Sequence, residues 1–219
     1  KNNPSIPVDL ELDYEGVSPM FGGEPVNEDG SKIEQKAEEA FARGHYEQHM
    51  AARGSITVDG KRFPIDGLGL RDHSWGPRFW QSIHWYRWLP MNFTRDFAMM
   101  VSITCGAKGE PRRGGMVLRG GEYVMIRDAR ISADYDANDN QTTMKIWAKT
   151  DEREYEVEGK VMSLIPLRNR RRSPDGEELM TRITEGMTEY RCDGHVGYGL
   201  SEFLDQIVDG RPLGKVAGC

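Results

Sequence analysis

The segment from Gly67 to Pro90 gathers the residue types from which an active site could be built. An arginine, an aspartate and a histidine follow one another at residues 71–73, and six aromatic residues fall within residues 75–88. Aromatic walls bury apolar ligands, and each ring face stabilises a developing cation by roughly 0.5–2 kcal/mol. An acid held among aromatic rings has its pKa raised by desolvation and can deliver a proton. We therefore expect a ligand pocket whose members are Arg71, Asp72, His73, Trp75, Trp85 and Trp88.

A simpler interpretation of the same segment stays open. The tryptophans can be core residues, and Arg71 and Asp72 can then form a buried salt bridge that pins a loop. For any single tryptophan this interpretation is the better one. For the segment as a whole we favour a pocket, because a β-domain ordinarily spreads its tryptophans over several strands.

A second polar cluster precedes the aromatic segment at residues 45–49. In a strand, His45, Glu47 and His49 would share one face, and with His73 they could form a metal site. Their spacing matches no standard metal motif, so we expect histidines satisfied by neighbouring carboxylates, with no metal and no cofactor. We assign Glu47 as a partner of the catalytic acid, and we assign three further residues to ligand binding: His45, Tyr46 and Glu202.

Composition excludes several other functions. The 219 residues carry a net charge of −6, whereas a phosphate-binding face needs a surplus of lysine and arginine, so we expect no nucleic-acid partner. No apolar run approaches the roughly 20 residues of a membrane-spanning helix. Three widely separated cysteines suit reduced thiols and a cytoplasmic location. The sequence is also compatible with a homodimer, and we expect a hydrophobic small molecule as the ligand. GxSxG, P-loop and dinucleotide-binding motifs are absent from the sequence.

Strand patterns dominate the elements that must position these residues. Residues 8–14 alternate apolar and acidic side chains, as a half-buried strand does. Asp59-Gly60 and Gly120-Gly121 predict tight hairpins, a third hairpin is expected near Asp151, and residues 97–105 predict a buried strand. One helix is expected over residues 33–43, and the arginine-rich residues 166–176 read as a solvated loop. The pattern indicates an all-β, antiparallel barrel or sandwich with one or two short helices.

The segment Gly69–Arg78 resembles the Asp-His-x-Trp-Gly signature of the carotenoid 1,2-hydratase (hydroxyneurosporene synthase) and AttH-like proteins. It is most similar to their uncharacterised bacterial members, which carry the form Arg-Asp-His-Ser-Trp-Gly. Residues 45–48 and 197–203 look similar to motifs of the same group. The resemblance implies a lipocalin-like (calycin) double barrel, with residues 1–43 as the tail of a first barrel plus a linker helix and residues 44–219 as a second barrel.

The resemblance also implies a reaction. In the hydratases an acid protonates an isolated alkene and water captures the cation, without a cofactor. Carried over to this chain, Asp72 is the acid, His73 or Glu47 its partner, and Trp75 lines the path of the cation. Ser74 stands where the hydratases have glutamine, and related barrels include cyclases, so the reaction could be hydration, dehydration or cyclisation of a terpenoid-, steroid- or carotenoid-like substrate. The alternative is a lipocalin-like carrier of a hydrophobic small molecule, in which residues 71–73 are structural.

Overall fold

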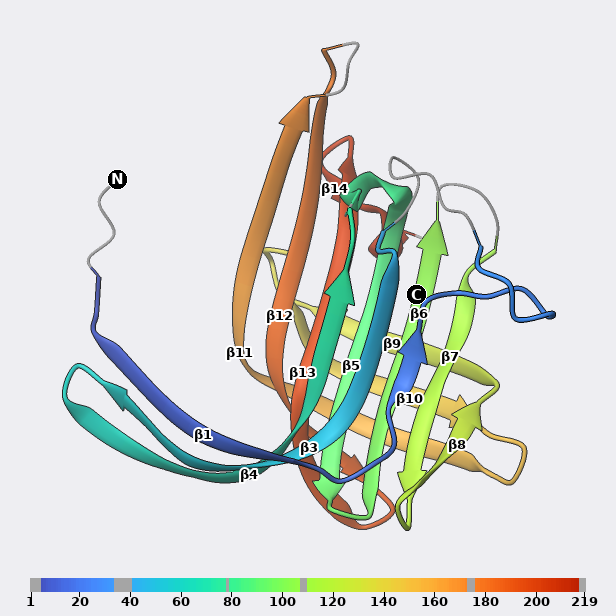
Figure 1. The fold of residues 1–219 in the computed structure, drawn as a ribbon. Helices are drawn as coiled ribbons and strands as arrows, with labels where there is room; N and C mark the ends of the chain where they lie inside the picture. Colours follow the sequence, from blue (N-terminus) through green and yellow to red (C-terminus); the bar gives the residue numbers. More distant parts are fainter. Residues whose placement is uncertain (1–4, 34–40, 78, 107–109, 173–175, 217–219) are drawn as a thin grey trace.

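The protein folds into two antiparallel β-sheets with very little helix (Figure 1). The computed structural model describes residues 5–33, 41–77, 79–106, 110–172 and 176–216. One sheet has four strands and lies at the N-terminus, and the other has ten strands and includes the C-terminal half of the chain. The all-β prediction is therefore confirmed.

The N-terminal sheet is built around one long hairpin. Its strands are β1 (Val8–Gly16), β2 (Phe21–Gly23), β3 (Gly44–Val58) and β4 (Lys61–Trp75). β3 pairs with β4 along its whole length, while β1 and β2 pair with its two halves. The turn at Asp59-Gly60 has φ values of 49° and 76°, the left-handed conformation that the predicted tight hairpin requires. In Figure 1 this turn and the start of β1 project away from the rest of the molecule.

The second sheet curls into a barrel. Its strands are β5 (Ile83–Thr94), β6 (Phe97–Gly106), β7 (Arg112–Arg119), β8 (Glu122–Ile126), β9 (Asp128–Tyr135), β10 (Gln141–Lys149), β11 (Glu154–Arg172), β12 (Glu178–Cys192), β13 (His195–Val208) and the short β14 (Arg211–Pro212). The order is β8-β7-β6-β5-β13-β12-β11-β10-β9. The Arg113 side chain on β7 donates to the carbonyl oxygen of Ala129 on β9 at 2.9 Å, which brings the two ends of the sheet together.

Apolar side chains fill the inside of this barrel. Alternate residues of each strand point inward, as the pleat requires. The fully buried members include Leu89, Met91, Met99, Val101, Ile103 and Val117. Trp85 is 3% exposed and belongs to this packed core, so its ring supports the barrel from within.

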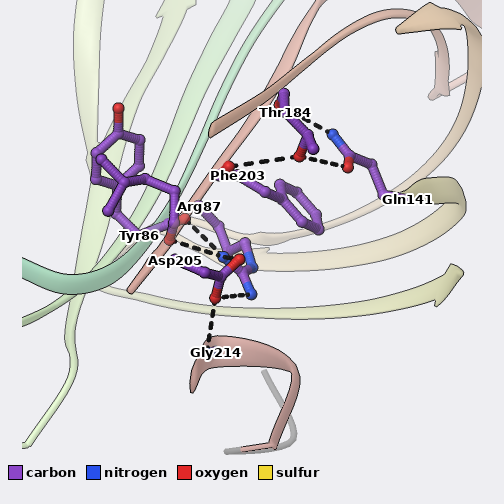
Figure 2. A network of polar contacts seen from close by, with 8 residues as sticks. Tyr86, Arg87, Gln141, Thr184, Phe203, Asp205 and Gly214 are labelled. Carbon is purple, nitrogen blue, oxygen red and sulfur yellow. Dashed lines mark hydrogen bonds and ion pairs between the residues drawn. The ribbon is translucent and has the colours of Figure 1, made fainter. Parts of the chain in front are cut away.

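One polar cluster interrupts the apolar interior near the C-terminus (Figure 2). The guanidinium of Arg87, fully buried, donates two hydrogen bonds of 3.1 Å to the carboxylate of Asp205 and lies 4.3 Å from the centre of the Phe203 ring. The backbone N–H of Gly214, in the short helix α1 (Leu213–Val216), donates to the same carboxylate at 2.7 Å. This ion pair therefore fastens α1 to the barrel.

Several expectations from the sequence can be compared with these elements. The hairpins at Gly120-Gly121 and near Asp151 are present, as is the buried strand β6. The loop predicted for residues 166–176 is wrong as far as Arg172, because β11 continues to that residue through pairing with β12. The expected helix at 33–43 lies mostly outside the described residues.

The N-terminal strands show two further differences. β1 forms where it was expected, but Val8 and Leu10 are 60% and 55% exposed rather than half-buried. The change from the first sheet to the second occurs after Trp75, since β3 pairs with β1, β2 and β4 in the first sheet and the next strand, β5, belongs to the second. A 3-10 turn, η1 (Trp80–Ser82), connects the sheets. The domain division at residues 43/44 stays a prediction.

Removing the Asp205 charge should destabilise the fold. In Asp205→Asn the buried Arg87 guanidinium keeps its charge without a counter-ion, and breaking a buried pair in this way costs about 3–5 kcal/mol. Asp66→Asn is the matched control, because the Arg53–Asp66 pair is exposed and such pairs contribute about 0–1 kcal/mol. Urea unfolding of both variants measures the difference. A loss below about 1 kcal/mol in Asp205→Asn would contradict the assigned role.

Candidate functional site

The two sheets are joined where β3 lies against the outer face of β5. The indole N–H of Trp88 donates to Glu47 Oε1 at 2.7 Å, and His49 Nδ1 lies 3.0 Å from Asn92 Oδ1. Trp88 and Asn92 point outward from the barrel because β5 turns Trp85, Arg87 and the following odd-numbered residues toward the core. Polar side chains of β3 therefore face polar and aromatic side chains of the barrel wall.

The pairing of β3 with β4 divides the Arg-Asp-His triplet between the two faces of the N-terminal sheet. Glu47 lies opposite Asp72, and Tyr46 lies opposite His73. Directly opposed residues of an antiparallel pair share a face. Asp72 is therefore on the inner face, toward the barrel, with His45, Glu47 and His49. Arg71, His73 and Trp75 are on the outer face with Tyr46.

The inner face holds a compact cluster of three titratable groups, which we call the inner cluster: His45, Glu47 and Asp72. His45 Nε2 lies 2.6 Å from Asp72 Oδ2 and 3.6 Å from Glu47 Oε1. The side chains of His45 and Asp72 are each 43% exposed, whereas Glu47 is 1% exposed. The solvent-accessible pair of His45 and Asp72 thus lies next to the buried carboxyl group of Glu47.

Burial governs the chemistry of Glu47. Loss of solvent raises the pKa of its carboxyl from the ordinary 4.5 to about 7, and the nearby Asp72 charge raises it further, while the Trp88 hydrogen bond and His45 act in the opposite direction. Its second oxygen, Oε2, is buried and has no hydrogen-bond partner within the described part of the chain. Near neutral pH this group can therefore hold or release a proton.

His49 is the fourth polar residue on the inner face. Burial lowers its pKa to about 4, so the imidazole is neutral at physiological pH. Asn92 Nδ2 donates to the carbonyl oxygen of Tyr198 at 3.3 Å, which orients the amide so that Oδ1 accepts from His49 Nδ1. His49 serves mainly to fasten β3 to β5, and no sequence pattern pointed to its partner Asn92.

The outer face carries a separate group of stacked side chains. The His73 ring lies 5.3 Å from the Tyr46 ring and 5.7 Å from the Trp75 ring, and the Arg71 guanidinium lies 5.1 Å from the centre of the Tyr46 ring. The indole N–H of Trp75 donates to Glu24 at 3.2 Å. The sequence placed these residues in one site with Asp72, but the period of two of a strand turns them away from it.

The barrel wall supplies the remaining predicted residue. Glu202 on β13 lies opposite Trp88 on β5, and it accepts a hydrogen bond from the Tyr86 hydroxyl. Tyr86 was not among the predicted site residues, although it shares a face with Trp88 because two positions separate them. Its ring contacts Phe41, which in turn contacts Trp80, with 6.1 Å and 5.6 Å between ring centres. Half-buried aromatic rings therefore lie beside the Tyr86–Glu202 pair.

The inner cluster also has the donor set of a cation site. One imidazole nitrogen and two carboxylate oxygens lie within 4.8 Å of one another, and all three residue types bind divalent metal ions. The sequence predicted no metal here, because Asp72 enters the cluster only through the pairing of β4 with β3.

The fold of this chain is similar to that of lipocalin-like double-barrel proteins. Similar solved structures are the AttH-like protein NE1406 of Nitrosomonas europaea (TM-score 0.55, 13% identity, 90% of this chain, 61% of that one) and kievitone hydratase of Nectria haematococca (0.52, 13%, 94% and 63%). CghA, solved with Sch210972, is a third (0.50, 14%, 85% and 61%). The chain thus spans less than two thirds of the length of each.

The family assignment comes from the sequence itself. The model of the domain of unknown function DUF7064 matches residues 3–207, and the chain belongs to that family. No curated protein sequence matches the chain. Among the described residues, no helix has the length and apolar character needed to span a membrane.

Replacing Glu47 should change how stability depends on pH in protein freed of metal ions by EDTA. The folded-state pKa of about 7 exceeds the ordinary 4.5 of the unfolded chain, so ionisation of Glu47 destabilises the fold progressively as pH rises from 4.5 to 7. Glu47→Gln keeps the shape and removes this loss. Between pH 5 and pH 8 the wild type should therefore lose about 2 kcal/mol more unfolding free energy than the variant.

Urea titrations at the two pH values measure this difference. The titratable groups that face Glu47 are His45 and His49 on β3, Asp72 on β4 and Tyr123 on β8, and all of them are retained in the variant. Exposed Glu158→Gln is the control and should leave the pH dependence unchanged. If the unfolding free energies of the wild type and Glu47→Gln depend on pH in the same way, ionisation of Glu47 does not destabilise the fold, and the prediction is wrong.

Proposed function

We propose that this protein is an enzyme of the hydratase or cyclase type, which moves a proton on a largely apolar substrate and needs no cofactor for that step. The observation that carries the proposal is the contact of 2.6 Å between His45 Nε2 and Asp72 Oδ2, half-exposed beside the buried Glu47. Proton transfer by positioned side chains typically accelerates a reaction 10²–10⁴-fold.

In the proposed reaction Asp72 and His45 are the groups that touch the substrate. They share one proton across their short contact. In hydration this proton goes to an alkene carbon; in dehydration it goes to the hydroxyl, which leaves as water, and a C–H proton of the resulting cation returns to the pair. Water supplies the oxygen in hydration and returns a proton to the pair, so that the enzyme ends as it began. Glu47 is a positioning residue, since the Trp88 hydrogen bond holds its carboxyl 3.6 Å from His45 Nε2.

The proposed substrate-binding surface is the seam between the two sheets, outside the barrel. The barrel interior is occupied by its own core, Trp85 included, whereas Trp88, Tyr86 and Glu202 lie on the wall that faces the N-terminal sheet. An apolar ligand would pack on these rings beside Asp72. We leave Arg71, His73, Tyr46 and Trp75 out of proton transfer, because they occupy the opposite face of β3 and β4.

Two of the similar structures support an enzymatic function. One is named a hydratase, and the other, CghA, was solved with Sch210972. At 13–14% identity these likenesses establish the fold, so the reaction type comes to this chain as part of the proposal.

A non-catalytic carrier is the second candidate. The observation in its favour is that Glu47 and His49 both bond to the barrel wall, which gives the polar residues of β3 a structural use. A carrier would need the seam and its aromatic wall, and the His45–Asp72 pair would then serve only to join β3 to β4.

Asp72→Asn separates the two candidates. As an enzyme, the variant should lose turnover at least about 100-fold while binding its ligand within about 3-fold of wild type. Kievitone and a panel of terpenoid alkenes and alcohols are the probes, with gain or loss of one water followed by mass spectrometry and binding by tryptophan fluorescence. The control is Asp66→Asn, an exposed aspartate on the same strand. Wild-type turnover in Asp72→Asn would exclude Asp72 as the acid. If the wild type and both variants bind a ligand but none of them turns it over, the carrier is favoured.

A further inference from the structure

The inner cluster presents three ligand atoms at the separations that a metal ion requires. The ligand residues His45, Glu47 and Asp72 come from two adjacent strands, each offers one ligand atom, and no two of these atoms are more than 4.8 Å apart. Ligand atoms about 2.0–2.1 Å from a tetrahedral ion lie about 3.3 Å from one another. The 3.6 Å between His45 and Glu47 fits this separation already. The 2.6 Å between His45 and Asp72 is shorter than this separation, so these two half-exposed side chains would have to move apart by about 0.7 Å.

The charges and hydrogen bonds of the cluster point independently to a cation. The carboxylates of Glu47 and Asp72 both lie close to the His45 imidazole, which is the only group with which either forms an ion pair in the part of the chain that the structure describes. The side chain of Glu47 is almost completely buried, yet none of the described residues forms a hydrogen bond with Oε2. Buried polar atoms are nearly always satisfied, so an unpaired carboxylate oxygen in a cluster of metal-binding groups needs an explanation.

The backbone and one neighbouring side chain hold the ligands in place. Glu47 and Asp72 are directly opposed in the β3–β4 ladder, and His45 is two residues before Glu47 on the same face. Trp88 donates to Glu47 Oε1 and so orients the carboxyl from outside the ligand set, as partners of metal ligands commonly do. The half-exposure of His45 and Asp72 leaves room for water in a fourth position.

We propose that His45, Glu47 and Asp72 form a binding site for one divalent transition-metal ion, with Zn²⁺ as the best match. One imidazole and two carboxylates suit Zn²⁺, which takes nitrogen and oxygen ligands in four-coordinate sites with an open position for water. Ca²⁺ needs six to eight oxygen ligands, and Mg²⁺ avoids imidazole and prefers an octahedral shell of oxygens. The cluster offers neither of these shells.

The metal site uses the same atoms as the proposed proton transfer, so the two occupancies exclude each other. Zn²⁺ between His45 and Asp72 takes the place of the shared proton. Bound Zn²⁺ should therefore inhibit turnover. Of the expectations for the metal site, only this inhibition rests on the proposed function. The binding of the ion does not depend on that function and can be measured without any substrate.

Isothermal titration of EDTA-treated, dialysed protein with Zn²⁺ is the test. We expect one ion per chain, at least about 100-fold weaker binding in His45→Ala and at least about 10-fold weaker binding in Asp72→Asn. Both residues are half-exposed, so the variants should fold, and Glu47→Gln provides a third variant with the side-chain shape retained. Co²⁺ should give the visible absorption of a four-coordinate ion, and Mg²⁺ should not compete.

His73→Ala is the matched control, since it removes an exposed imidazole next to Asp72 in sequence but on the other face of β4. It should bind Zn²⁺ within about 3-fold of wild type. Absence of Zn²⁺ binding, or binding that His45→Ala leaves unchanged, would overturn the metal site. Turnover measured in EDTA tests the proposed function separately, so failure of one proposal is distinguishable from failure of the other.

Discussion

The hydrogen bond from Trp88 to Glu47 is the contact on which the site depends, because it joins the two sheets through a buried group. A carboxyl with 1% exposure would be expelled toward solvent unless something fixed it, and the indole N–H of the barrel wall does so at 2.7 Å. With Glu47 held in that position, its neighbours in the ladder follow. His45 lies two residues away on the same face, and Asp72 lies directly opposite.

The packed interior of the barrel has a direct consequence for function. Lipocalin-like barrels can hold a ligand inside, but here residues such as Leu89, Met91 and Val101 are completely buried in the barrel core. The Arg87–Asp205 pair and α1 occupy the region near the C-terminus. The polar side chains of the candidate site lie instead at the outer surface of β5 and β13, where the N-terminal sheet lies against the barrel. The proposed substrate and the proposed metal ion both bind there.

Proton transfer and metal binding draw on the same three side chains for one physical reason. Two carboxylates held close to an imidazole repel each other and stabilise any positive charge placed among them. A shared proton and a divalent ion are two ways of supplying that charge. The two proposals therefore concern alternative states of one cluster, with either the proton or the ion bound.

By itself, the sequence determined the class of fold and the neighbourhood of the site. Period-two alternation and tight-turn residues such as Asp59-Gly60 predicted antiparallel hairpins, because these signals are local and need no distant partner. The residues of the inner cluster were all among the predicted site residues. The prediction of a loop at residues 166–172 was wrong. These residues belong to β11, because pairing with β12 overrides the local preference of an arginine-rich sequence.

Only the tertiary structure decided which of these residues act together. Register is a property of two strands, and a shift of one residue moves every side chain to the opposite face. The pairing of Glu47 with Asp72 therefore separates Asp72 from Arg71 and His73, its neighbours in the chain. It joins Asp72 instead to His45, which is 27 residues away in sequence. The burial that alters the proton affinity of Glu47 likewise comes from packing against the barrel, where Trp88 of β5 contacts it, so no local pattern could have revealed it.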